Sequence, residues 1–165
     1  MKKFLSALCL AVAVAMAPAF VATPHAVAQE AGSLQAMEAD IEALLIAHAG
    51  DPDAFAAAIE EYVIASGDPE LAADAVISVL TRPTTDPEMK VAGGKGLGAA
   101  IALIGLTDPT AAANMQAKVE ASGDTVLQAA VAEGNAERTA SILRQQQQQQ
   151  QQQQDSTPET PVSPN

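Results

Sequence analysis

The chain has 165 residues with 20 acidic and eight basic side chains, which gives a formal net charge of −12 at pH 7. A protein this acidic is repelled by nucleic acid and by anionic lipid headgroups, so we expect no nucleic-acid partner. The chain has no tryptophan, one tyrosine and one cysteine, which leaves little for base stacking or for disulfide and thiolate chemistry.

The first 28 residues have the three parts of a cleavable secretory signal peptide. Two lysines directly after Met1 give a positive start, and an uncharged, largely apolar stretch follows. Ala26-Val27-Ala28 then offers small residues at the positions that signal peptidase reads. We expect cleavage before Gln29, a short leader at residues 29–32, and Sec-type export to a bacterial periplasm or to the medium. Loss of both lysines changes the formal charge from −12 to −14, because all 20 acidic residues follow the cut.

Two alternatives to cleavage are weaker. An uncleaved membrane anchor would use residues 4–22, which nearly reach the length of a spanning helix, but Pro18 interrupts this run. A lipid anchor would use Cys9, but Leu8 precedes it at a position where a small residue is expected.

Residues 33–144 contain glycine and aspartate pairs that mark where helices end and begin. In Gly50-Asp51-Pro52 and in Gly67-Asp68-Pro69, we expect the glycine to take a left-handed conformation after one helix. The aspartate then caps the next helix, and the proline fits its first turn. Gly123-Asp124 and Gly134-Asn135 repeat the stop and the cap without the proline. We therefore expect about seven short helices, at 34–49, 52–66, 69–81, 87–104, 109–122, 125–133 and 136–145 or beyond.

Apolar residues in this region recur at helical spacing. Met37, Ile41 and Leu45 share one stripe of the first helix, while Phe55 and Ile59 share one stripe of the second. No segment alternates as a strand would. The predicted fold class is all-α, with a single domain at 33–144, either a compact bundle or a stack of helical hairpins joined by tight Gly-Asp or Gly-Asn turns.

Residues 91–106, VAGGKGLGAAIALIGL, form a glycine-rich stretch with one charge. Gly94, Gly98, Ala102 and Gly105 share one helical face and would let another backbone approach closely. We interpret this face as the packing face of a central core helix. The alternative is an interaction face that pairs with another copy or contacts a membrane. Membrane contact is not favoured, because sixteen residues are short for a span.

The same stretch formally matches a nucleotide-binding pattern at Gly94-Lys95-Gly96-Leu97-Gly98-Ala99. No strand precedes it, however, and the fold has no βαβ unit that would hold a dinucleotide. A mononucleotide loop would need serine or threonine after the lysine, where this chain has glycine. We therefore expect no cofactor.

His48 is the only histidine after the predicted cut. It ends the first helix on the apolar stripe, where a cation also favours the helix dipole, so we interpret it as structural. Glu60 and Glu61 are adjacent, so their side chains point about 100° apart on a helix and cannot act as a facing pair. We expect no catalytic residue and no metal site.

Residues 145–165 form a low-complexity tail with ten consecutive glutamines followed by a proline-rich end. Glutamine is a good helix former, so the run either prolongs the preceding helix or is disordered. We assign the whole tail as a disordered, solvated spacer.

These observations favour an exported, non-enzymatic helical protein of the cell envelope or exterior. It would act by binding another protein or by self-association, so the expected partner is an envelope or extracellular protein, or a second copy of this chain. The alternative is a membrane-associated or membrane-active protein that acts through residues 91–106. A small enzyme is the third and weakest reading.

Overall fold

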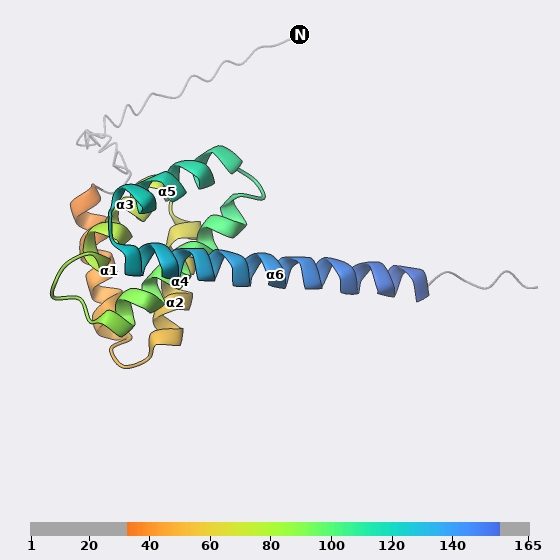
Figure 1. The fold of residues 1–165 in the computed structure, drawn as a ribbon, viewed down its shortest axis with the longest axis horizontal. Helices are drawn as coiled ribbons and strands as arrows, with labels where there is room; N and C mark the ends of the chain where they lie inside the picture. The colour runs from red at the N-terminus through yellow and green to blue at the C-terminus, as the bar shows by residue number, and fades with distance from the viewer. Residues whose placement is uncertain (1–32, 156–165) are drawn as a thin grey trace, which may run out of the picture.

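A computed structural model of the chain describes residues 33–155, which are helical without strands, as predicted (Figure 1). The predicted signal peptide, the leader and the proline-rich end lie outside the described residues. The described part contains six helices: α1 (Leu34–Ala47), α2 (Pro52–Ala65), α3 (Pro69–Leu80), α4 (Pro87–Ile104), α5 (Pro109–Ala121) and α6 (Thr125–Asp155).

Aspartates cap the helices as the sequence predicts. The Asp51 carboxylate accepts a hydrogen bond from the Ala54 amide at 3.0 Å, and the Asp68 carboxylate accepts one from the Leu71 amide at 3.0 Å. Each bond satisfies an amide in the first turn that has no partner within its own helix. Asp86, Asp108 and Asp124 accept amide hydrogen bonds in the same way at the starts of α4, α5 and α6.

The glycines at the helix joints differ from the prediction in one place. Gly50 and Gly123 have φ of 87° and 69°, in the left-handed region that favours glycine. Gly67 was predicted to do the same, but it is not among the glycines with positive φ. Here Ser66 has already left the helix in an extended conformation, and its hydroxyl accepts a hydrogen bond from the Asp68 amide at 3.1 Å. The chain therefore turns at Ser66 without a left-handed glycine.

The predicted count of seven helices is wrong for the described residues because α6 does not stop at Gly134-Asn135. Gly134 is buried inside α6, at its contact with α4. A Cβ atom there would overlap the backbone carbonyl oxygen of Lys95. The glycine thus leaves room for a neighbouring backbone instead of ending a helix, and the two predicted segments are one.

Helix α6 also continues through the glutamine run, which the sequence predicts to be part of a disordered tail. Residues 145–155 are helical, which is the other outcome that the glutamine composition left open. The costly first turn of α6 forms within the packed domain, so each added glutamine only has to extend an existing helix. Glutamine is among the better residues for that extension.

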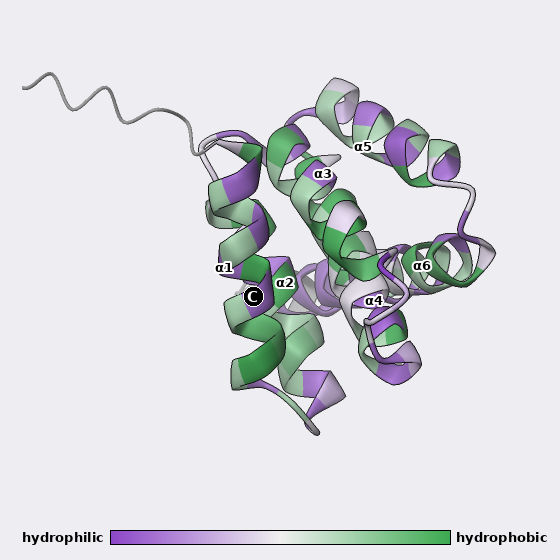
Figure 2. Ribbon diagram, turned by 90° about the vertical axis from the view of Figure 1, so that its left-hand side faces the viewer, coloured by the Kyte–Doolittle hydropathy of each residue, from purple (hydrophilic) through white to green (hydrophobic). Residues whose placement is uncertain are grey.

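Helix α4 is the centre of the bundle and contacts α2, α3, α5 and α6. Its most extensive contacts are with α6 and α2, which are distant from one another in sequence. Helix α3 lies between α1 and α5, as Figure 2 shows. In an open helical array each hairpin would contact only its sequence neighbours, so these contacts are those of a bundle.

The core is apolar and includes Ile41, Phe55 and Ile59 of the predicted stripes, together with apolar residues of the later helices. Its largest fully buried side chains include Phe55 and Ile59 from α2, Leu80 from α3, Leu97 from α4 and Leu127 from α6. Within residues 33–152 no polar or charged side chain is buried, so the polar chemistry of these residues lies at the surface.

Candidate interaction surface

The predicted glycine face of α4 divides between the interior and the edge of the bundle. Gly94 and Gly98 are buried under α6, whereas Ala102 and Gly105 are half-buried. A Cβ atom at Gly94 would lie 2.7 Å from the Cβ of Ala130, and one at Gly98 would overlap the carbonyl oxygen of Val131. The first two residues of the face therefore serve a close helix crossing within the domain.

Two further glycines extend this close packing. A Cβ atom at Gly96 would overlap the carbonyl oxygen of Ala56 on α2, and Gly134 approaches Lys95 from α6. Both faces of α4 thus contact a neighbouring helix at backbone distance. The cluster of glycines was visible in the sequence, but Gly134 was not recognised as part of the same contact, because its pairing with asparagine resembles a helix stop.

The formal nucleotide pattern at residues 94–99 lies in the middle of α4. Backbone amides inside a helix donate to carbonyls four residues earlier and cannot also surround a phosphate. The geometry therefore gives this segment a packing role.

Three ion pairs hold the first half of α6 on the domain. The Nζ of Lys90 on α4 lies 2.7 Å from the Asp124 carboxylate, and the Nζ of Lys95 lies 2.8 Å from the Glu133 carboxylate. The guanidinium of Arg138 lies 2.5 Å from the carboxylate of Glu60 on α2. These pairs join α6 to two different helices and so fix the direction in which it leaves the domain.

Two of these pairs shift the pKa of their members. The hydrogen bond from Lys90 is the main reason that the pKa of the Asp124 carboxyl is below its usual value, and the bond from the Leu127 amide adds to it. The hydrogen bond with Glu133 is the main reason that the pKa of Lys95 is raised. Both shifts favour the charged forms that the ion pairs need.

A charged groove of about 480 Å³ lies next to these ion pairs, between α2, α4 and α6. Its charged residues include Asp53, Lys95, Glu137 and Arg138. Lys95 and Arg138 are both engaged in ion pairs, so the groove presents no excess of positive charge to an anion. Within the described residues, no group of three or more histidine, cysteine, aspartate or glutamate side chains is arranged to hold a metal ion.

His48 follows α1 as its C-terminal cap and is half-buried. Its backbone amide donates to the Leu44 carbonyl at 3.0 Å, which closes the last turn of the helix. His48 thus lies at the helix end, where the sequence places it, and the bond that closes the turn comes from its backbone.

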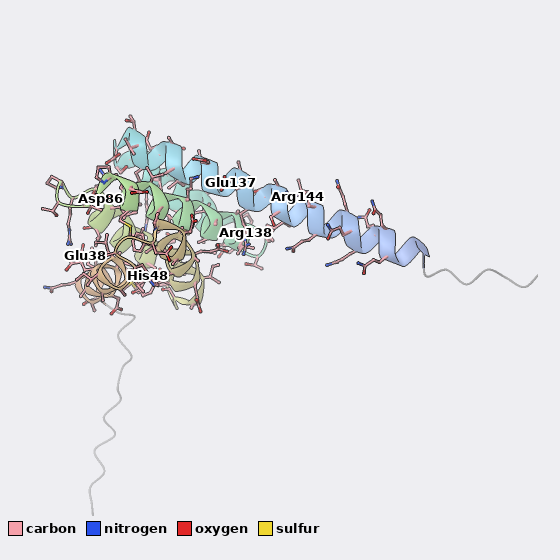
Figure 3. All side chains as sticks on the ribbon, turned by 90° about the horizontal axis from the view of Figure 1, so that it is seen from below. Glu38, His48, Asp86, Glu137, Arg138 and Arg144 are labelled. Atoms are coloured by element: carbon pink, nitrogen blue, oxygen red, sulfur yellow. The ribbon has the colours of Figure 1, made fainter. Side chains whose placement is uncertain are left out.

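Helix α6 leaves the other helices toward its C-terminal end and projects there as a single helix (Figure 1). Figure 3 shows Arg144 on the projecting part. We call residues 144–155 the arm. Side chains from Arg144 to Gln152 are all exposed, and Arg144 is the only charged residue among them.

A second groove, of about 630 Å³, runs along α6 beside α5, where the arm begins. We call it the α5–α6 groove. Its exposed apolar residue, Leu143, is 53% accessible. The groove is lined by Gln116 of α5 and, on α6, by Ala132, Asn135, Ala136, Thr139, Ala140 and Leu143.

None of the helices within residues 33–155 combines the length and the hydropathy that crossing a membrane requires. No protein-family model matches this sequence, and comparisons with curated proteins and with solved structures likewise found no match.

Proposed function

We propose that this chain is an exported, non-enzymatic helical protein that binds another protein or a second copy of itself through the arm. Export rests on the signal-peptide pattern of residues 1–28. The observation that carries the binding role is the arm, a continuation of α6 whose side chains from Arg144 to Gln152 are exposed.

The way α6 is anchored supports this role. A flexible tail would pay the entropy of ordering when it binds, whereas a helix held at its base presents its side chains in a fixed array. The ion pairs of Asp124, Glu133 and Arg138 provide that base. The rest of the domain then acts as a support for the arm.

The chemistry of the arm also fits a protein partner. Each glutamine amide supplies two donors and an acceptor that can be satisfied across an interface. A chain of net charge −12 repels other acidic surfaces, but the arm has one basic residue, Arg144, and one acidic residue, Asp155, and so carries no net charge. An acidic protein is therefore repelled less by the arm than by the chain as a whole.

The membrane-associated alternative has less support. It requires residues 91–106 to be available to lipid, and Gly94 and Gly98 of that segment are covered by α6. Exposing them would separate α4 from its most extensive contact. We therefore do not propose this alternative.

The test compares the full chain with two truncations. One ends at Arg144 and removes the glutamine run, and the matched control ends at Asp155 and removes only the proline-rich end. We expect the first truncation to lose both capture of proteins from envelope extract and self-association, while the control keeps whichever of these the full chain shows. If the chain that ends at Arg144 captures proteins and self-associates as well as the full chain does, the arm is not the binding element.

A further inference from the structure

The helix of the glutamine run has no tertiary packing of its own. Side chains from Gln145 to Gln152 are exposed, and among the described side chains the core contains none from the run. The backbone is nevertheless helical through Asp155. An isolated helix shorter than about 12–15 residues is marginal in water, so a run of ten glutamines would not hold this conformation by itself. Its helix depends on the turns of α6 that precede it.

Those preceding turns are fixed by contacts with the rest of the domain. The ion pairs of Asp124, Glu133 and Arg138 join them to α4 and α2, and Gly134 lies against the backbone of α4. All four residues come before the run in the chain. The run therefore extends a helix that already exists, and it can unwind from its far end without breaking any of these contacts.

The size of this effect follows from the cooperativity of helix formation. With a propagation constant of about one per residue, a helix that enters the ten glutamines ends at each position with similar probability. The run is then fully unwound in about one molecule in ten. If the run were disconnected from α6, it would have to nucleate a new helix, with a nucleation constant of about 10⁻³, and nearly every molecule would have it unwound.

The unwound run is the form that can pair with other chains. A glutamine run without proline is typical of segments that assemble as β strands, in which backbone groups and side-chain amides bond from chain to chain. In a helix the same backbone N–H and C=O groups are bonded within the chain. Helix formation and β pairing therefore compete for the same groups.

We propose that the folded domain, through α6, holds the glutamine run in a helix and thereby restrains it from β pairing with other glutamine-rich chains. The dependence has one direction: the run needs the domain for its helix, whereas the core contains no described side chain of the run. This restraint operates whether or not the arm also binds a partner.

Two proline variants of the full chain separate the helix from the composition of the run. Gln145→Pro interrupts α6 between the domain and the run, because proline lacks the amide hydrogen and its ring clashes with the carbonyl four residues earlier. Gln154→Pro is the matched control, since it interrupts only the far end. Each variant keeps nine of the ten glutamines in one run, with one proline beside them and the same net charge.

The first measurement is circular dichroism. We expect Gln145→Pro to lose the helical signal of the run and Gln154→Pro to keep most of it. Both variants should melt at the temperature of the parent chain, which shows that the domain remains folded. A helical signal in Gln145→Pro equal to that of Gln154→Pro would overturn the inference, because the run would then be helical without the domain.

The second measurement is incorporation into preformed β fibres of a synthetic polyglutamine peptide, followed as loss of soluble chain. We expect Gln145→Pro to be incorporated up to about tenfold faster than Gln154→Pro, in proportion to the unwound fraction. The chain that ends at Arg144 lacks the run and should stay in solution. Equal rates for the two proline variants, no incorporation of Gln145→Pro, or incorporation of the shortened chain at the same rate would each overturn the restraint.

Discussion

Tyr62 is the only tyrosine of the chain and joins α2 to α1. Its hydroxyl donates a hydrogen bond to the Asp40 carboxylate at 3.2 Å. The pKa of Tyr62 is raised to about 12, mainly by burial, with smaller contributions from the charge of Asp40 and from its hydrogen bond. The neutral phenol is thus the form that the folded protein favours.

The first prediction concerns this pKa. Ultraviolet titration of tyrosinate should give a midpoint near 12 in the parent chain. Asp40→Asn should lower the midpoint toward the usual value of 10, yet keep it above 10 because burial, the largest cause, remains. Since the folded pKa exceeds the unfolded pKa, the contribution of Tyr62 to stability is present below pH 10 and is lost as the pH rises to 12. A control, Glu61→Gln, alters an exposed neighbour and should leave the midpoint in place.

The second prediction concerns the capping aspartates. Asp51→Ala and Asp68→Ala each remove the acceptor of a first-turn amide, so each should lower the free energy of unfolding by about 1 kcal/mol. Chemical denaturation measures this loss. The matched variants to asparagine keep an acceptor and should retain most of the stability. Equal losses for alanine and asparagine would show that the cap is not the stabilising contact.

At the scale of the helices, α4 and α6 can cross closely because the residues at the centre of the crossing are glycines, which have no side chain. Gly98 and Gly134 lie on opposite sides of this crossing, and each faces the backbone of the other helix. Four glycines in one helix cost about 1 kcal/mol each in helix propensity, so close packing must offset about 4 kcal/mol in α4. Contacts with α2 and α6 at backbone distance provide that packing.

The third prediction tests this crossing with Gly98→Ala. The new Cβ would overlap the Val131 carbonyl oxygen and lie 2.8 Å from the Asn135 nitrogen, and a backbone contact cannot be relieved by rotating a side chain. We expect overpacking to cost about 1–3 kcal/mol, against a gain of at most about 1 kcal/mol in helix propensity. Thermal melting should therefore occur at a lower temperature.

Gly67→Ala is the control for this prediction, because nothing lies within 4 Å of its Cβ position. Its melting temperature should stay close to that of the parent chain. An unchanged or raised melting temperature for Gly98→Ala would contradict the close backbone contact between α4 and α6.

At the scale of the whole molecule, the domain and the arm have separate sources of stability. The ion pairs that anchor α6 end at Arg138, and side chains from Gln145 to Gln152 are exposed. Among the described side chains, the core contains none from the glutamine run. The domain should therefore not need the arm in order to fold.

The fourth prediction follows from this separation. A chain that ends at Arg144 should melt at nearly the same temperature as the full chain, because no core contact is lost. Its total helical signal in circular dichroism should fall, since residues 145–155 are helical. The chain that ends at Asp155 should keep both properties. A large fall in melting temperature on removal of the arm would show that the glutamine run packs on the domain.

The helix starts and the core stripes could be predicted from the sequence because the physics that produces them is local. A capping aspartate acts on an amide two or three residues away, and the following proline fits the first turn wherever the helix lies in the fold. An apolar stripe likewise records that a face is buried, though not against which partner. For this reason Asp51, Asp68 and the Phe55–Ile59 stripe were recognised without a structure.

The meaning of individual glycines was decided only by the tertiary structure. Gly134 looks like a helix stop in the sequence, because no side chain reveals that Lys95, far away in the chain, needs the space. Packing within the domain was the favoured interpretation of Gly98, with a second copy or a membrane as the alternative, and the crossing of α4 and α6 shows which backbone it faces. Local capping and periodicity were therefore determined by the sequence itself, whereas the helix crossings and the projection of the arm depend on contacts between residues far apart in the chain.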